Sequence, residues 1–274
     1  MVRERILGFS NKCTWLGLLG CVEYYLDNPQ AYRRAVDLLK YGISLSPDLF
    51  PCICEVLWKM DNENAASICF SDVSDVLGMM VVAINERAWT PSDEDCPIDL
   101  VCLLFIYLVD LLCRVMTTED EASSVGQLVD GLVRTRCRTD DGRTLLHVAV
   151  HPIKDDDDDV PTVTPSSVVV GHLLEAGAAA DATDVRKNTP LHAVVFSQPE
   201  TSPVRDEIVN LLLQHGAHVD AANAEGRTVS DCLSPNLVFD HVSLKCLAAR
   251  AVRSYKLPYR GNVPATLADF VDRH

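Results

Sequence analysis

One sequence segment occurs twice in the second half of the chain, and a weaker copy follows. Asp-Gly-Arg-Thr-Leu-Leu-His at 141–147 is echoed by Lys-Asn-Thr-Pro-Leu-His at 187–192 and, more weakly, by Glu-Gly-Arg-Thr-Val-Ser at 225–230. Between the copies, Leu-Leu-Glu-Ala-Gly-Ala at 173–178 matches Leu-Leu-Gln-His-Gly-Ala at 212–217. A unit that recurs in this way cannot bury its apolar face alone, so neighbouring copies must stack. These residues therefore predict a repeat architecture.

The recurring segments are signatures of the ankyrin repeat, a pair of helices preceded by a turn. We expect Thr189 to cap a helix that begins at Pro190, because a threonine cap and a first-turn proline are typical of helix starts. We expect Gly177 and Gly216 to end the second helix of each repeat in the left-handed conformation. The sequence thus predicts two clear repeats and a degenerate third within residues 137–238.

The spacing between copies exceeds the usual ankyrin length of about 33 residues. Two insertions account for the excess, the acidic stretch 155–165 and the stretch 197–203. We expect both to lie between the two helices of one repeat, because a surface loop can lengthen there at low entropic cost. So short an array is unstable alone, so we expect it to continue the preceding helices as one helical solenoid.

The first 136 residues predict helices throughout, with neither strand alternation nor a Gly-rich phosphate loop. Apolar residues recur at helical spacing after Pro29. Further helices are expected at 48–60, 72–89, 97–116 and 119–134. Short loops between such helices predict antiparallel helical hairpins. The fold class is therefore all-α.

Composition restricts the environment and the partners. The net charge of −15 makes nucleic acid and anionic membrane surfaces poor partners. The most apolar run, Leu100–Val109, is too short to cross a bilayer and predicts a core helix. The eleven cysteines are odd in number, and no secretory segment opens the chain. Because Cys102 and Cys113 lie in apolar stretches as buried thiols do, we expect a reducing compartment, the cytoplasm or the nucleus.

Metal and nucleophilic chemistry find weak support in the sequence. His147 and His151 lie four residues apart, but Val148 stands where a zincin-type site has glutamate. His215 and His218 flank a turn glycine, and a lone Cys-x-Cys at residues 52–54 has no second pair at zinc-ribbon spacing. We therefore expect no catalytic residue, no metal and no cofactor.

The segment 242–252 predicts an amphipathic helix near the carboxyl end. At 100° per residue one face is apolar and small, and the opposite face is basic. The apolar stripe consists of Leu244, Leu247, Ala248, Ala251 and Val252. Between Lys245 and Arg260 there are five basic residues and no acidic one. Two interpretations stay open from this pattern, a helix that docks on a partner and a terminal helix that caps the repeats.

Two short motifs bear on that choice. The run Ser-Leu-Lys-Cys-Leu-Ala-Ala-Arg-Ala-Val at 243–252 resembles the elongin-binding box of cullin-RING ubiquitin ligase receptors. Val-Pro-Ala-Thr-Leu at 263–267 resembles the short cullin-2 box that follows it. Together the two motifs resemble a VHL box.

A wider resemblance covers nearly the whole chain. The residues from 243 to 272, together with Arg-Glu-Arg-Ile-Leu-Gly at 3–8 and the placement of the ankyrin pair, resemble the Fem (feminization) family of substrate receptors for cullin-2 ubiquitin ligases. This resemblance implies a tetratricopeptide-like region at 1–136, ankyrin repeats at 137–238 and a VHL-box tail at 239–274. In the family a larger ankyrin array precedes these parts and recognises substrate degrons. Nothing in this sequence corresponds to that array, so we expect only the carboxyl-terminal two-thirds of the family pattern.

The resemblance also implies partners and contact residues. Elongin C, bound together with elongin B, would contact Leu244, Cys246, Leu247, Ala248 and Val252. Cullin-2 would contact Val263, Pro264 and Leu267. The chain would then be a non-catalytic adaptor that recruits substrate proteins of unknown identity. The alternative is an ankyrin-repeat scaffold whose tail only caps the stack, and exposure of the Leu244 stripe distinguishes the two.

Overall fold

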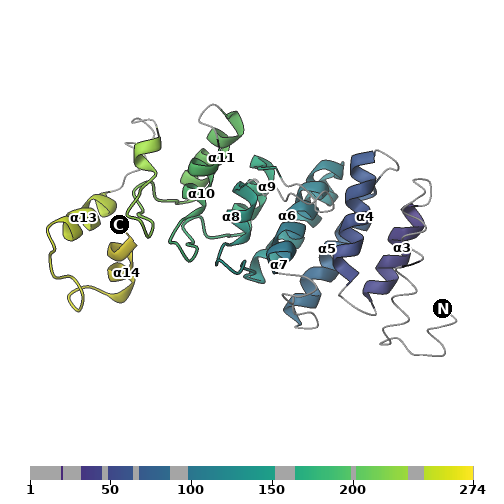
Figure 1. Cartoon of the computed structure of the whole chain (residues 1–274), viewed down its shortest axis with the longest axis horizontal. Helices are drawn as coiled ribbons and strands as arrows, with labels where there is room; N and C mark the ends of the chain where they lie inside the picture. Colours follow the sequence, from purple (N-terminus) through teal and green to yellow (C-terminus); the bar gives the residue numbers. More distant parts are fainter. Residues whose placement is uncertain are drawn as a thin grey trace. The chain divides into compact units, whose positions relative to one another are not determined.

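The structure is a computed structural model of the 274-residue chain. It describes residues 20, 32–44, 49–63, 68–86, 98–151, 164–198, 202–233 and 244–273. Within these residues every regular element is a helix and none is a strand (Figure 1). The predicted all-α class is confirmed. The chain divides into two compact units, residues 1–139 with 153–163, and residues 140–152 with 164–274.

The first unit consists of helical hairpins. Its described long helices are α3 (Tyr32–Ile43), α4 (Phe50–Glu63), α5 (Phe70–Asn85), α6 (Ile98–Val115) and α7 (Glu119–Arg134). Helix α3 packs on α4, and α5 packs on both α6 and α7. The expected helices agree with these bounds to within a few residues. The opening motif at 3–8 lies outside the described residues.

Helix α6 forms the centre of this unit. Its residues are buried almost without interruption from Val101 to Leu112, which accounts for the apolar run in the sequence. Arg114 near its end makes a two-pronged contact with Asp61 of α4, at 2.9 and 2.7 Å. Among the helices that the structure describes, none is both long and apolar enough to cross a membrane.

The start of α7 follows directly from the local sequence. The Thr118 hydroxyl accepts the N–H of Glu121, and the Glu121 carboxylate accepts the N–H of Thr118 in return. The Glu121 carboxylate also accepts the N–H of Thr117, which is the main reason that the pKa of this carboxyl is lowered. A reciprocal cap of this kind fixes where a helix begins.

The second unit contains the ankyrin helices and the carboxyl-terminal tail. Its elements are α8 (Leu145–Val150), α9 (Ser167–Glu175), α10 (Pro190–Ser197), α11 (Pro203–Gln214), the short 3-10 helix η3 (Ser230–Cys232), α13 (Leu244–Ser254) and α14 (Ala265–Arg273). Helix α8 packs on α9 and α10, and α11 packs on α9 and α10. Helices α8 and α9 flank the first predicted insertion and α10 and α11 the second, but residues 155–163 and 199–201 of these insertions lie outside the described residues.

Two histidines join successive repeats. His192 Nδ1 accepts the N–H of Thr189, so Nε2 carries the proton and donates to the Arg227 carbonyl at 3.2 Å. His147 does the same one repeat earlier, and its Nε2 lies 2.9 Å from the Asn188 carbonyl oxygen. Each histidine therefore caps its own helix and holds the next turn.

The predicted ends of the second helices are confirmed. Gly177 has a φ of 85° and Gly216 a φ of 92°. In both cases the residue after the glycine donates its N–H back into the last turn, to Leu173 or to Leu212. These bonds satisfy carbonyls that a helix end otherwise leaves without partners.

Candidate protein-docking site

Helices α13 and α14 pack together at the carboxyl end of the second unit. Their common core consists of Cys246, Ala249, Phe270 and Val271, with Val252, Tyr259 and Leu267 packed around it. The core is small because the residues that α13 contributes are short. The predicted elongin-binding residues all lie on α13, Leu267 lies on α14, and Val263 and Pro264 directly precede α14.

The buried face of α13 is tied to the ankyrin part of the same unit. The Cys246 sulfur lies 3.5 Å from Nδ1 of His218, which follows the end of α11. The His218 ring meets Phe270 edge to face, with ring centroids 5.4 Å apart. Lys245 places its ammonium 4.0 Å from the centroid of the same Phe270 ring. Cys246 thus ties α13 to the ankyrin part directly, and Phe270 of α14 contacts both His218 and Lys245.

The predicted apolar stripe lies on the other side. Leu244 is 85% exposed and Leu247 is 49% exposed. Ala248 and Ala251 are also exposed, and Val252 is half-buried at the edge of the core. An amphipathic helix normally turns its apolar stripe toward its own core. Here the core takes the smaller face of Cys246 and Ala249, and most of the stripe faces outward.

The structure divides the residues predicted to bind elongin between two faces. Cys246 is fully buried, whereas Leu244, Leu247 and Ala248 are exposed. Cys246 is therefore placed to hold the helix in position, while the leucines are placed for contact. Spacing alone did not reveal this division, because it says nothing about which neighbour a helix meets.

A tight turn follows α13 and enlarges the apolar surface. The N–H of Leu257 bonds to the Val252 carbonyl and that of Lys256 to the Arg253 carbonyl, and Lys256 has a φ of 51°. This is the Schellman arrangement, in which glycine is the usual residue at the left-handed position. Tyr255 and Leu257 are both at least half exposed here. Sequence reasoning missed Tyr255, although its position four residues after Ala251 continues the stripe.

The loop between the two helices is held by one carboxylate. Asp272 accepts hydrogen bonds from the Tyr259 hydroxyl and from Arg260, the latter at 2.8 Å. These two donors, with Tyr259 the stronger influence, lower the pKa of the Asp272 carboxyl. The loop consequently has a fixed path from α13 to α14.

The residues predicted to contact cullin-2 lie at the start of α14. Pro264 is exposed and Val263 is half-buried. Leu267 is also half-buried and packs against the core of the helix pair. A substitution of Leu267 would therefore also disturb the core. Pro264 is the better position for testing surface contact with cullin-2.

Comparison with known proteins places this geometry in a family. A sequence profile described as "Ankyrin repeat" matches residues 186–224. The chain is 30% identical to "Protein fem-1 homolog A" of Bos taurus and of Homo sapiens, over its whole length. The chain is homologous to the Fem-1 proteins. "Protein fem-1 homolog C" of Mus musculus is 28% identical over all of the chain and 48% of its own length.

The resemblance of this Fem-related chain to its family is thereby confirmed. The chain spans 45% of the bovine relative and 44% of the human one, so it matches somewhat under half of their length. The ankyrin profile covers the second repeat, from the turn before α10 through α11. The comparisons thus show a repeat protein that is similar to the Fem-1 proteins.

Two thiols of the first unit lie where burial opposes their ionisation. Burial raises the pKa of Cys113 to about 11 and also raises the pKa of Cys52. Cys54, the other half of the Cys-x-Cys pair, is fully buried in α4. Because the thiolate is the reactive form, these cysteines are suited to packing and not to nucleophilic attack.

Proposed function

We propose that the chain is a non-catalytic adaptor of an elongin–cullin-2 ubiquitin ligase, acting in ubiquitin-dependent protein degradation. The outward face of α13, with Leu244, Leu247 and Ala248 at its centre and Val252 at its edge, contacts elongin C and through it elongin B. Val263 and Pro264 contact cullin-2, with Leu267 behind them. Substrate proteins are held elsewhere on the adaptor.

The exposure of the Leu244 stripe supports this proposal most directly. Leu244 is 85% exposed on a helix that buries Cys246 and Ala249 on its other side. Contiguous exposed apolar surface on a folded domain marks a site for another protein. Alanines at 248 and 251, both exposed, let a partner helix approach closely. A helix that only capped the repeats would place this stripe against them.

The mechanism is positional. Tethering a substrate beside a charged ubiquitin-conjugating enzyme raises the effective concentration of its lysines, and the adaptor itself breaks and forms no bonds. The adaptor needs a docking helix in a fixed orientation. Cys246 and Phe270 provide this by anchoring the inner face of α13.

Co-purification with elongin B, elongin C and cullin-2 tests the proposal. We expect wild type to form a stoichiometric complex. Leu244→Ser forfeits about 1.5–3 kcal/mol of apolar burial, which corresponds to at least about a tenfold loss in affinity for elongin C. Pro264→Ala should weaken cullin-2 capture and leave elongin binding intact.

Val168→Ser is the matched control, because Val168 is another exposed aliphatic residue, 53% exposed at the start of α9. It should bind like wild type. If the folded wild-type chain captures neither elongin nor cullin, the ligase proposal is wrong. The tail is then a structural cap and the chain a protein-binding scaffold.

A further inference from the structure

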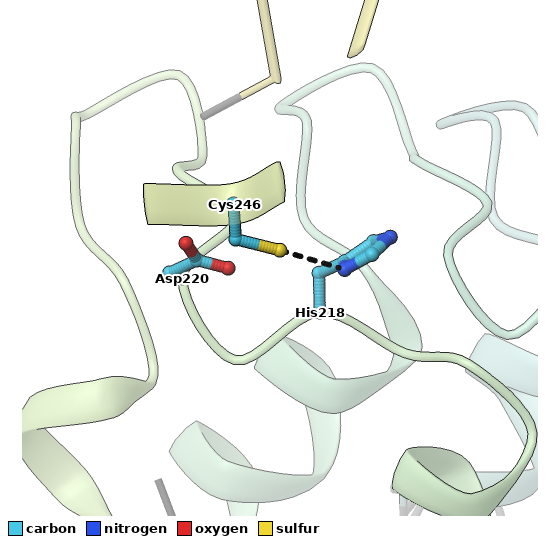
Figure 2. A group of neighbouring side chains, drawn as sticks. All are labelled: His218, Asp220 and Cys246. Carbon is cyan, nitrogen blue, oxygen red and sulfur yellow. Dashed lines mark hydrogen bonds between the residues drawn. The ribbon is translucent and has the colours of Figure 1, made fainter. Parts of the chain in front are cut away.

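Three side chains with metal-binding chemistry meet where α13 packs on the ankyrin part of its unit. His218 and Asp220 come from the segment after α11, and Cys246 comes from α13. One ligand atom from each lies within 4.8 Å of the other two. Figure 2 shows the Cys246 sulfur pointing at the His218 ring, with the Asp220 carboxylate beside them. In the described part of the chain, no other group of three potential ligands is this close.

The best-defined distance in the cluster fits a tetrahedral ion. The Cys246 sulfur and His218 Nδ1 are 3.5 Å apart. An ion about 2.3 Å from sulfur and about 2.0–2.1 Å from nitrogen, at a tetrahedral angle, places those two atoms roughly 3.5 Å apart. The thiol and imidazole are therefore already at the spacing of two zinc ligands. A carboxylate oxygen of Asp220 lies within 4.8 Å of both of these atoms.

Burial and charge favour the same class of ion. Cys246 is fully buried and Asp220 is 1% exposed. A divalent ion beside a carboxylate and a thiolate makes the group neutral, which suits a buried site. A sulfur and an imidazole nitrogen in one set select a zinc-type ion over calcium or magnesium, which prefer oxygen ligands.

We propose that His218, Asp220 and Cys246 bind one zinc-type divalent cation, with water as the fourth ligand. Of the three side chains, His218 also borders a cavity of about 130 Å³ that Thr183 and Asp272 help to line. The ion joins α13 to a segment 28 residues earlier in the chain. It fixes the inner face of α13 and leaves the outer stripe free. The site does not depend on what binds that stripe.

Metal analysis of the purified chain is the direct test. After incubation with zinc chloride and dialysis against metal-free buffer, elemental mass spectrometry should find one zinc per chain. Cys246→Ala and His218→Ala should each lose it. Cys232→Ala is the matched control, because Cys232 is an exposed cysteine in the same unit, and it should retain the zinc.

A milder variant and a second metal keep the test valid if an alanine variant fails to fold. Asp220→Asn keeps the sulfur and nitrogen ligands and should weaken zinc binding by at least about tenfold, a loss typical of disturbing a ligand set. With cobalt(II) in place of zinc, wild type should show a thiolate charge-transfer band, and Cys232→Ala should keep it.

Wild-type protein that holds no stoichiometric zinc and shows no cobalt–thiolate band would overturn the proposal. The contact between Cys246 and His218 would then be a thiol–imidazole hydrogen bond and nothing more. Zinc that persists in a folded Cys246→Ala variant would overturn it equally.

Discussion

Helices α10 and α13 lie in the same unit and use their apolar residues in opposite ways. α10, eight residues long, buries Pro190, Leu191, His192, Val194 and Val195. α13, eleven residues long, buries only Cys246 and Ala249 among its described side chains, and leaves two leucines exposed. Most of the apolar side chains of α10 are thus buried by folding, and Phe196 is the exception. The sequence of α13 retains an apolar face that folding does not need.

Truncating one leucine in each helix should give the largest difference in the free energy of unfolding. Leu191 of α10 is fully buried, so Leu191→Ala should lower the free energy of unfolding by about 2–5 kcal/mol. Leu244→Ala on α13 should change it by less than about 0.5 kcal/mol, because the side chain is already in water. Urea unfolding followed by circular dichroism measures both. A cost above about 1 kcal/mol at Leu244 would show that the stripe is packed and would break the comparison.

Removing the histidine of α10 should have the next largest effect. His192→Ala leaves the buried Thr189 N–H and the Arg227 carbonyl without their partner, which should cost about 1–3 kcal/mol. The same urea experiment measures the loss. His215→Ala, at the end of α11, is the control and should cost less, because that side chain is exposed.

The histidine also gives α10 a pH dependence. Burial lowers the pKa of His192 below its unfolded value of about 6.5. The unfolded chain therefore binds the proton more readily, and stability is full above about pH 6.5 and falls as the pH drops below it. Unfolding midpoints for wild type and His192→Gln, between about pH 7.5 and 5, should converge toward low pH. Parallel curves would contradict this assignment.

One lysine near each helix has a left-handed backbone conformation. Replacing each with glycine should have a smaller effect on stability, and the two effects can be compared. Lys187, in the turn before α10, has a φ of 59°, and Lys256, after α13, has a φ of 51°. A non-glycine residue there costs roughly 1 kcal/mol, so Lys187→Gly and Lys256→Gly should each stabilise their region by up to that amount. Thermal unfolding reports the first, and amide exchange over 244–273 reports the second. Stabilisation at Lys187 alone would mean that the tail unfolds apart from the repeats.

The smallest effect concerns the loop after α13. Tyr259 and Arg260 lower the pKa of Asp272, so their contribution is present above the unfolded pKa of about 3.9 and is lost as the pH falls below it. Asp272→Asn should remove this part of the pH dependence. Amide exchange in residues 255–264 between about pH 5 and 2 compares the two proteins. Equal exchange in both at every pH would argue against the role of this carboxylate.

Local features of the fold were predictable from sequence because their causes are local. The bounds of α6 and α7, the Thr189 cap and the glycine ends at Gly177 and Gly216 each depend on residues within one or two turns. The apolar stripe of α13 was predictable for the same reason. Its orientation was not, since Cys246 turns inward to meet His218, which lies 28 residues away.

The sequence by itself therefore determined the helices, their caps, the repeated units and the presence of a stripe around Leu244. The tertiary structure decided which face of α13 is buried, and it brought His218, Asp220 and Cys246 within reach of one ion. The physical reason is that helix formation is governed by neighbours along the chain. The choice between two packable faces depends on which surface the rest of the fold presents to them.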